Sequence, residues 1–169
     1  KGKAEDIFTA WMETMNKYLS ECDVNNISGV AVAMPGPFMY DNGISVIEGT
    51  HKYDCLFGIN IRKAIESSLL KDNNVPVIFA NDAACFALGE SISGKAKDHR
   101  KIIAITLGTG LGSAFIQDRQ ALEPSEQTPY TGILYKLPFR DGIAEDYISS
   151  RWIVNEYASL TGEKTEAKE

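Results

Sequence analysis

The chain has 169 residues, a formal net charge of −6 at pH 7, and 44% hydrophobic and 24% charged residues, which excludes a disordered or fibrous protein. An acidic chain lacks the clustered Lys and Arg that bind phosphate backbones, so we expect no contact with nucleic acid. No apolar run reaches the roughly 18 residues that a membrane span needs, which predicts a soluble protein without membrane contact.

The first part of the sequence alternates helical and strand patterns. Apolar residues from Ile7 to Cys22 recur at steps of three and four, which predicts a helix that packs on one face. The apolar run Ile27 to Met34 ends at Pro35-Gly36-Pro37, so we expect a buried strand followed by a rigid turn. The turn residues Asp41-Asn42-Gly43 predict a hairpin, with Ile44 to Ile47 as its return strand.

A second alternation follows. A helical stripe runs from Ile61 to Leu69 after Asn60, a possible N-terminal cap. Val75 to Ala80 is the next predicted strand, and Ala83 to Ile92 the next helix. The order strand, helix, strand, helix is typical of α/β architecture.

The last part of the sequence contains a glycine hairpin and a final helix. Ile102 to Leu107 and Ala114 to Ile116 are predicted strands, joined by the glycine-rich stretch Gly108 to Gly112. Residues 118–142 contain three prolines and little periodicity, so we expect a long loop there. The last helix is predicted to run from Ile143 to Leu160.

The cysteines and histidines give no sign of a disulfide framework or a metal site. Cys22, Cys55 and Cys85 are odd in number, far apart and outside any C-x-x-C pair. This usage is typical of a reducing compartment and predicts a cytoplasmic protein. His51 and His99 have no acidic or cysteine partner at ligand spacing, and we expect both at the surface.

The glycine-rich stretch is the first candidate for chemistry, because backbone N–H groups beside glycines can approach an anion without a side chain in the way. Its spacing is G-x-G-x-G and an apolar strand follows, whereas a dinucleotide-binding motif needs G-x-G-x-x-G at the start of a helix. It also lacks the G-K-[ST] ending of a P-loop. Two interpretations remain from the residues alone, a phosphate cradle and a plain tight hairpin.

Asn81 and Asp82 are the second candidate, at the point where a predicted strand gives way to a helix. Ligands of open α/β sheets gather at the carboxyl ends of the strands. Asp82 there has the chemistry to deprotonate a substrate hydroxyl, and Asn81 offers both a donor and an acceptor. Both residue types also cap helices well, and capping does not exclude catalysis.

Two further features are weaker. Pro35-Gly36-Pro37 lies at a predicted strand end, where a turn alone explains these residues. Glu145 and Asp146 fall in the first turn of the last predicted helix, where the helix dipole favours carboxylates.

The order and spacing of three segments resemble the ROK family of sugar kinases and sugar-responsive repressors. These segments are Val30 to Pro37, Asn81 to Glu90 and Thr106 to Gly112. The resemblance implies α/β architecture of the actin-like, ribonuclease H-like kind, in which two lobes surround a nucleotide cleft. Residues 1–92 would belong to the first lobe and residues 93–169 to the second, and the fold would be incomplete at both ends.

The resemblance also implies roles for individual residues. Asp82 would be the general base that takes the proton of the attacking sugar hydroxyl. The substrate-binding residues would be Asn81, Glu145, Pro35 and Gly36, and the nucleotide phosphate loop would comprise Gly108, Thr109 and Gly110. ATP and Mg²⁺ would be the cofactors, a hexose the substrate, and a homodimer the default assembly.

The sequence also departs from the family pattern. The stretch from Glu123 to Asp141 has no histidine and no cysteine, so we predict no structural zinc. The family's first phosphate loop would precede Lys1 and its adenosine-binding segment would follow Glu169, so we expect this chain to be inactive alone.

Three functions follow as hypotheses: a glucokinase-like hexose kinase, the sugar-sensing domain of a transcriptional repressor, and a silent actin-like assembly domain. An upstream helix-turn-helix would favour the repressor, and an upstream glycine-rich phosphate loop the kinase. The silent domain predicts no saturable hexose binding.

Overall fold

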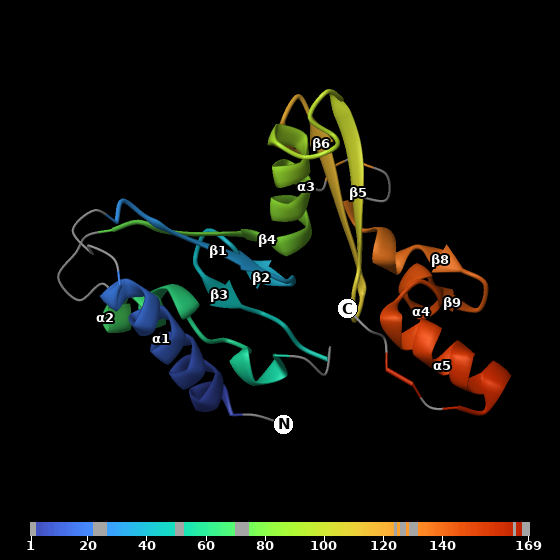
Figure 1. Cartoon of the computed structure of the whole chain (residues 1–169), viewed down its shortest axis with the longest axis horizontal. Coiled ribbons are helices and arrows are strands. Elements are labelled where there is room, and N and C mark those ends of the chain that lie inside the picture. The colour runs from blue at the N-terminus through green and yellow to red at the C-terminus, as the bar shows by residue number, and fades with distance from the viewer. Residues whose placement is uncertain are drawn as a thin grey trace. The chain divides into compact units, whose positions relative to one another are not determined.

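The computed structural model divides the chain into two compact units, Lys1–Asp82 and Ala83–Glu169 (Figure 1). The residues that it describes are 3–21, 27–49, 53–69, 75–123, 125, 128, 132–163 and 165–166. The division lies at the start of a helix, while the assignment of residues 1–92 and 93–169 to two lobes stays a prediction.

The first unit is built on two parallel strands. Strand β1 (Val30–Met34) pairs with β4 (Val77–Asn81), and the register runs from Val30 opposite Val77 to Met34 opposite Asn81. Helices α1 (Ala4–Ser20) and α2 (Ile61–Leu69) lie side by side in this unit (Figure 1). The core consists of Met34, Phe38, Leu56, Ile61, Ile65, Val77 and Phe79.

The sequence patterns of this unit are confirmed in part. The strand predicted to be buried from Ile27 to Met34 begins at Val30, and Met34 is its only buried residue. The predicted apolar stripe of α1 packs against the core through Ile7, Phe8, Trp11, Met12 and Met15. Asn60 caps α2, because its Oδ1 accepts a hydrogen bond from the backbone N–H of Lys63 at 2.9 Å.

The predicted hairpin forms between β2 (Phe38–Met39) and β3 (Ile44–Ser45). Gly43 has a φ of +71° and donates its N–H to the Met39 carbonyl at 2.8 Å, which closes the turn. The return strand is shorter than predicted because β2 offers only two residues for pairing. The chain then continues to a 3₁₀ helix, η2 (Asp54–Leu56).

The second unit contains a three-stranded antiparallel sheet in the order β5, β6, β7. Its strands are β5 (Lys101–Leu107), β6 (Leu111–Gln117) and β7 (Gln120–Ala121). Helix α3 (Asp82–Ile92) packs on the β5–β6 hairpin through small residues (Figure 1). This core comprises Ala83, Ala87, Ala104, Ala114 and Ile116.

The region predicted as one long loop, residues 118–142, contains regular elements in its described parts. Besides β7 these are a 3₁₀ helix, η4 (Leu134–Lys136), and the strand β8 (Pro138–Phe139), which pairs with β9 (Gly142–Ile143). The loop prediction was wrong there because such short elements have no periodicity to detect.

The last predicted helix is interrupted. It consists of α4 (Ala144–Tyr147) and α5 (Ser150–Thr161). Between them Ser149 is extended, and its side chain accepts the N–H of Trp152 at 3.3 Å as the cap of α5. The prediction of one continuous helix was wrong because the apolar pattern continues across this cap.

In the described part of the chain, neither Cys55 nor Cys85 forms a disulfide, and His99 is exposed. Cys22 and His51 lie outside the described residues. No helix in that part has both the length and the apolar character for crossing a bilayer.

Candidate functional site

The candidate site of the first unit lies at the ends of β1 and β4. Because these strands are parallel and Met34 pairs with Asn81, the residues that follow each strand emerge at the same edge. Pro35 and Gly36 follow β1, while Asn81 is the last residue of β4. A Cβ atom on Gly36 would lie 4.0 Å from the Asn81 amide nitrogen, so these two predicted sugar-binding residues are neighbours.

A tyrosine that the sequence analysis did not single out joins this group. The Tyr40 hydroxyl donates to the Met34 carbonyl at 3.1 Å and accepts a hydrogen bond from Asn81 Nδ2 at 3.2 Å. Its oxygen would lie 3.5 Å from a Cβ atom on Gly36. No periodicity or motif in the sequence marks Tyr40. Its role depends on contacts with the ends of β1 and β4, which form only in the folded chain.

Asp82 is the first residue of α3 and is exposed. In the first turn of a helix its carboxylate is favoured by the helix dipole. Exposure also leaves a carboxylate accessible to a substrate hydroxyl. The capping and catalytic interpretations of Asp82 therefore remain compatible in the structure.

The candidate site of the second unit is the turn between β5 and β6, formed by Gly108, Thr109 and Gly110. Gly108 donates its N–H to the Gly110 carbonyl at 3.0 Å. The Gly108 carbonyl accepts the backbone N–H of Ser150 at 2.9 Å and also the Ser150 hydroxyl. The start of α5 thus fixes one end of the glycine turn.

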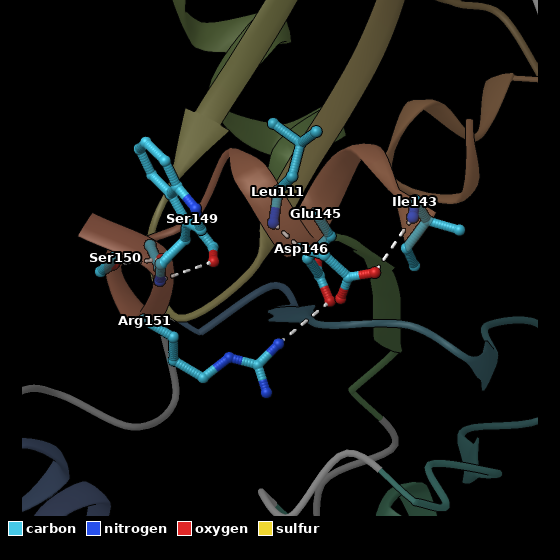
Figure 2. A network of polar contacts seen from close by, with 9 residues as sticks. Leu111, Ile143, Glu145, Asp146, Ser149, Ser150 and Arg151 are labelled. Carbon is cyan, nitrogen blue, oxygen red and sulfur yellow. Dashed lines mark hydrogen bonds and ion pairs between the residues drawn. The ribbon is translucent and has the colours of Figure 1, made fainter. Parts of the chain in front are cut away.

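Glu145 fixes the other end of this turn. Its Oε2 accepts the backbone N–H of Leu111 at 2.8 Å, and its Oε1 lies 3.7 Å from Arg151 Nη2 (Figure 2). A Cβ atom on Gly110 would overlap Oε2 and lie 3.2 Å from the carboxyl carbon. Only glycine at position 110 therefore allows the carboxylate to reach the Leu111 amide without displacement.

The two adjacent carboxylates of α4 have different roles. Asp146 Oδ2 accepts the N–H of Ile143 at 3.0 Å and so caps the start of α4, whereas Glu145 reaches the glycine turn (Figure 2). By residue type alone both residues had one explanation, the helix dipole, and the family resemblance added a sugar-binding role for Glu145 only. The structure separates them, because that explanation suffices for Asp146 and not for Glu145.

The glycine turn has the features of an anion site. Thr109 is exposed, and the backbone N–H groups of Thr109 and Gly110 make no backbone hydrogen bond within the described residues. Consecutive amides of this kind suit a phosphate oxygen. No group of three or more potential metal-ligating side chains occurs in that described set. Mg²⁺ in phosphoryl-transfer sites is bound largely by phosphates and water, so such a group is not required.

Two carboxylates elsewhere in the described part of the chain have a lowered pKa. The hydrogen bond from Arg100 lowers the pKa of Asp118 near the opposite end of the β5–β6 hairpin. The hydrogen bond from the Tyr147 hydroxyl lowers the pKa of Asp141. Both carboxylates serve local structure.

Comparison with known proteins adds relatives of two kinds. The chain is 28% identical over 94 residues to a beta-glucoside kinase of Listeria monocytogenes, covering 55% of this chain and 30% of the relative. It is 52% identical over 42 residues to a glucokinase of Streptomyces coelicolor, covering 25% and 13%. It is 31% identical over 88 residues to the xylose repressor of Bacillus subtilis, covering 52% and 21%. The chain therefore matches less than a third of the length of each of these three relatives.

Among solved structures, a ROK family glucokinase from Streptomyces griseus in complex with glucose and AMPPNP superposes with a TM-score of 0.72. The identity is 22%, and the match covers 96% of this chain and 52% of that protein. The fold is therefore the predicted α/β, actin-like fold. The family model of the ROK family matches residues 3–125, and the chain belongs to this family. The family contains both sugar kinases and repressors among the relatives of this chain.

Proposed function

We propose that the protein containing this chain is an ATP-dependent hexose kinase of the glucokinase kind. The hydrogen bond between the Leu111 amide and Glu145 carries this proposal. It connects a residue predicted to bind the sugar directly with the turn predicted to bind the phosphate. The beta-glucoside kinase and glucokinase relatives support it. The assay concerns the full-length polypeptide, since the relatives extend well beyond the matched segments.

In the proposed reaction Asp82 accepts the proton of one sugar hydroxyl. The oxygen of that hydroxyl forms a bond to the γ-phosphorus of ATP, the bond from this phosphorus to the β–γ bridging oxygen breaks, and ADP leaves. Mg²⁺, when bound, would neutralise charge on the phosphates. The exposed position of Asp82 at the start of α3 suits a base that must meet a substrate hydroxyl.

The other predicted residues would position the reactants. Asn81 and Glu145 would bind further sugar hydroxyls, and Pro35 and Gly36 would line the sugar side. Gly108, Thr109 and Gly110 would bind the transferred phosphate through backbone amides. We also propose a homodimer, as the family resemblance implies, and a cytoplasmic location, as the cysteine usage predicts.

The test is the substitution Asp82→Asn in the full-length protein. Loss of a general base slows turnover by about 10²- to 10⁴-fold, so hexose-dependent ADP formation should nearly vanish while hexose binding by calorimetry persists. Asp98→Asn removes another exposed aspartate and should leave turnover unchanged. Turnover by Asp82→Asn within a few-fold of the unsubstituted protein would contradict the assignment.

The second candidate is the sugar-sensing domain of a transcriptional repressor. The similarity to the xylose repressor favours it, and a sensor can keep the same sugar-binding residues. It predicts saturable hexose binding without ADP formation, and a helix-turn-helix upstream in the reading frame. ADP formation that depends on both a hexose and Asp82 would exclude it as the main function.

A further inference from the structure

Tyr40 links the ends of the two parallel strands of the first unit. Its hydroxyl lies within hydrogen-bond distance of the Met34 carbonyl at the end of β1 and of the Asn81 amide at the end of β4, at 3.1 and 3.2 Å. Met34 and Asn81 are also register partners. The Tyr40 hydroxyl therefore links β1 and β4 through its side chain at the last residue pair of the two strands.

The chemistry of the hydroxyl fixes the direction of both bonds. A phenol has one proton, and the Met34 carbonyl can only accept, so the proton of Tyr40 is donated there. The oxygen of Tyr40 must then accept from Asn81, which is possible only if Asn81 turns its NH₂ group toward the tyrosine. The amide oxygen of Asn81 consequently lies on the opposite side of the group.

The tyrosine itself is held firmly. Its ring lies against Phe38, with centroids 5.2 Å apart, and Phe38 in turn contacts Phe79 at the same centroid distance. Phe38 and Phe79 are buried members of the core, and Tyr40 packs against that core. A side chain anchored in this way can impose an orientation on Asn81.

We propose that Tyr40 is a positioning residue for sugar recognition, which fixes the orientation of the Asn81 amide and so presents its oxygen as the acceptor for a sugar hydroxyl. This inference rests on the proposed function, in which Asn81 binds a hexose. A fixed amide oxygen favours a sugar that has a hydroxyl at this position over a sugar that lacks it. An amide that can flip discriminates less between the two sugars, because it can present either its oxygen or its NH₂ group. Tyr40 thereby contributes to the choice of sugar without touching it.

The first experiment compares Tyr40→Phe with the unsubstituted full-length protein in sugar-dependent ADP formation. One net hydrogen bond corresponds to a change of about two- to twelve-fold, so the KM for the hexose should rise by that factor while kcat changes by less than about two-fold. Tyr18→Phe removes a hydroxyl from an exposed tyrosine of α1 and should change neither constant. Discrimination against the deoxy analogue that lacks the Asn81-bound hydroxyl should fall in Tyr40→Phe.

A double-mutant cycle separates positioning from a general structural effect. With Asn81→Ala the amide is gone, so adding Tyr40→Phe should raise the KM no further. The role of Tyr40 would be overturned if the double variant showed the product of the two single rises in KM. It would also be overturned if Tyr40→Phe by itself left the KM unchanged. If the full-length protein binds a hexose without turnover, the dissociation constant replaces the KM under the same criteria.

A measurement without sugar distinguishes this inference from the proposed function. The side-chain ¹⁵N amide signals of Asn81 should shift in Tyr40→Phe and stay in place in Tyr18→Phe, because only the former removes the hydrogen-bond acceptor. Unchanged Asn81 signals in Tyr40→Phe would refute the positioning role of Tyr40 and leave the proposed kinase function standing. Absence of both hexose turnover and hexose binding in the unsubstituted protein would refute the proposed function, and this role with it.

Discussion

The substitution Gly110→Ala tests how the glycine turn is held. The new methyl group would overlap Glu145 Oε2, which is the flexible end of a side chain and can move aside. The backbone therefore need not shift, but the carboxylate would lose its 2.8 Å hydrogen bond from the Leu111 amide. Leu111 is a buried residue with 6% exposure, so its N–H would be left without this partner in a place that water reaches poorly.

The expected cost follows from that lost bond. A hydrogen bond to a charged group, or a buried donor left unsatisfied, corresponds to about 1–3 kcal/mol. The ion pair of Glu145 with Arg151 is partly exposed, most of all at Arg151, and adds little, because surface pairs contribute at most about 1 kcal/mol. We therefore expect Gly110→Ala to lower the free energy of unfolding by about 1–3 kcal/mol more than a glycine-to-alanine substitution whose new Cβ atom contacts nothing.

Gly108→Ala provides that reference. It lies in the same turn, and a Cβ atom there has no neighbour within 4 Å. Both substitutions restrict the unfolded chain alike, so this contribution of about 0.4–1 kcal/mol cancels in the comparison. Urea unfolding of the two variants in the full-length protein measures the difference.

The hypothesis also predicts the outcome in the Glu145→Ala background. Without the carboxylate, Gly110→Ala should cost no more than Gly108→Ala. Equal unfolding free energies of the two single variants, or a penalty that persists without Glu145, would refute the role assigned to this contact.

Two further predictions concern other parts of the chain. Gly43→Ala should lower the free energy of unfolding by about 1–3 kcal/mol more than Gly49→Ala in urea unfolding. Both glycines have a φ above +70°, but only at Gly43 would the new Cβ meet Arg62 Cβ, at 2.6 Å, and equal losses would contradict this. The hydrogen bond from Arg100 lowers the pKa of Asp118 below its usual value of 3.8, so its stabilisation is present above pH 4 and disappears as the pH falls through the lowered pKa. The stability difference between the unsubstituted protein and Asp118→Asn should therefore shrink in urea unfolding below pH 4, and a difference independent of pH would argue against the pair.

Local patterns predicted those features that depend on neighbours in sequence. The periodicity of α1, the cap at Asn60 and the glycine hairpin between β5 and β6 all follow from short stretches of residues. The break between α4 and α5 was missed, since a serine cap inside a continuing apolar pattern gives no periodic signal. The boundaries of short elements such as β8 are set by pairing, which a window of sequence does not contain.

By itself the sequence determined the order of the motifs, and with it the expectation of an α/β sugar-kinase fold. It also placed Asn81 at a strand end and glycines at a turn, because those residue types answer local backbone needs. The contact of Tyr40 with Asn81, and that of Glu145 with the amide after Gly110, join residues 41 and 34 positions apart. Only the tertiary structure decides such contacts, because they depend on which strand ends and helix starts the packed core brings to one place.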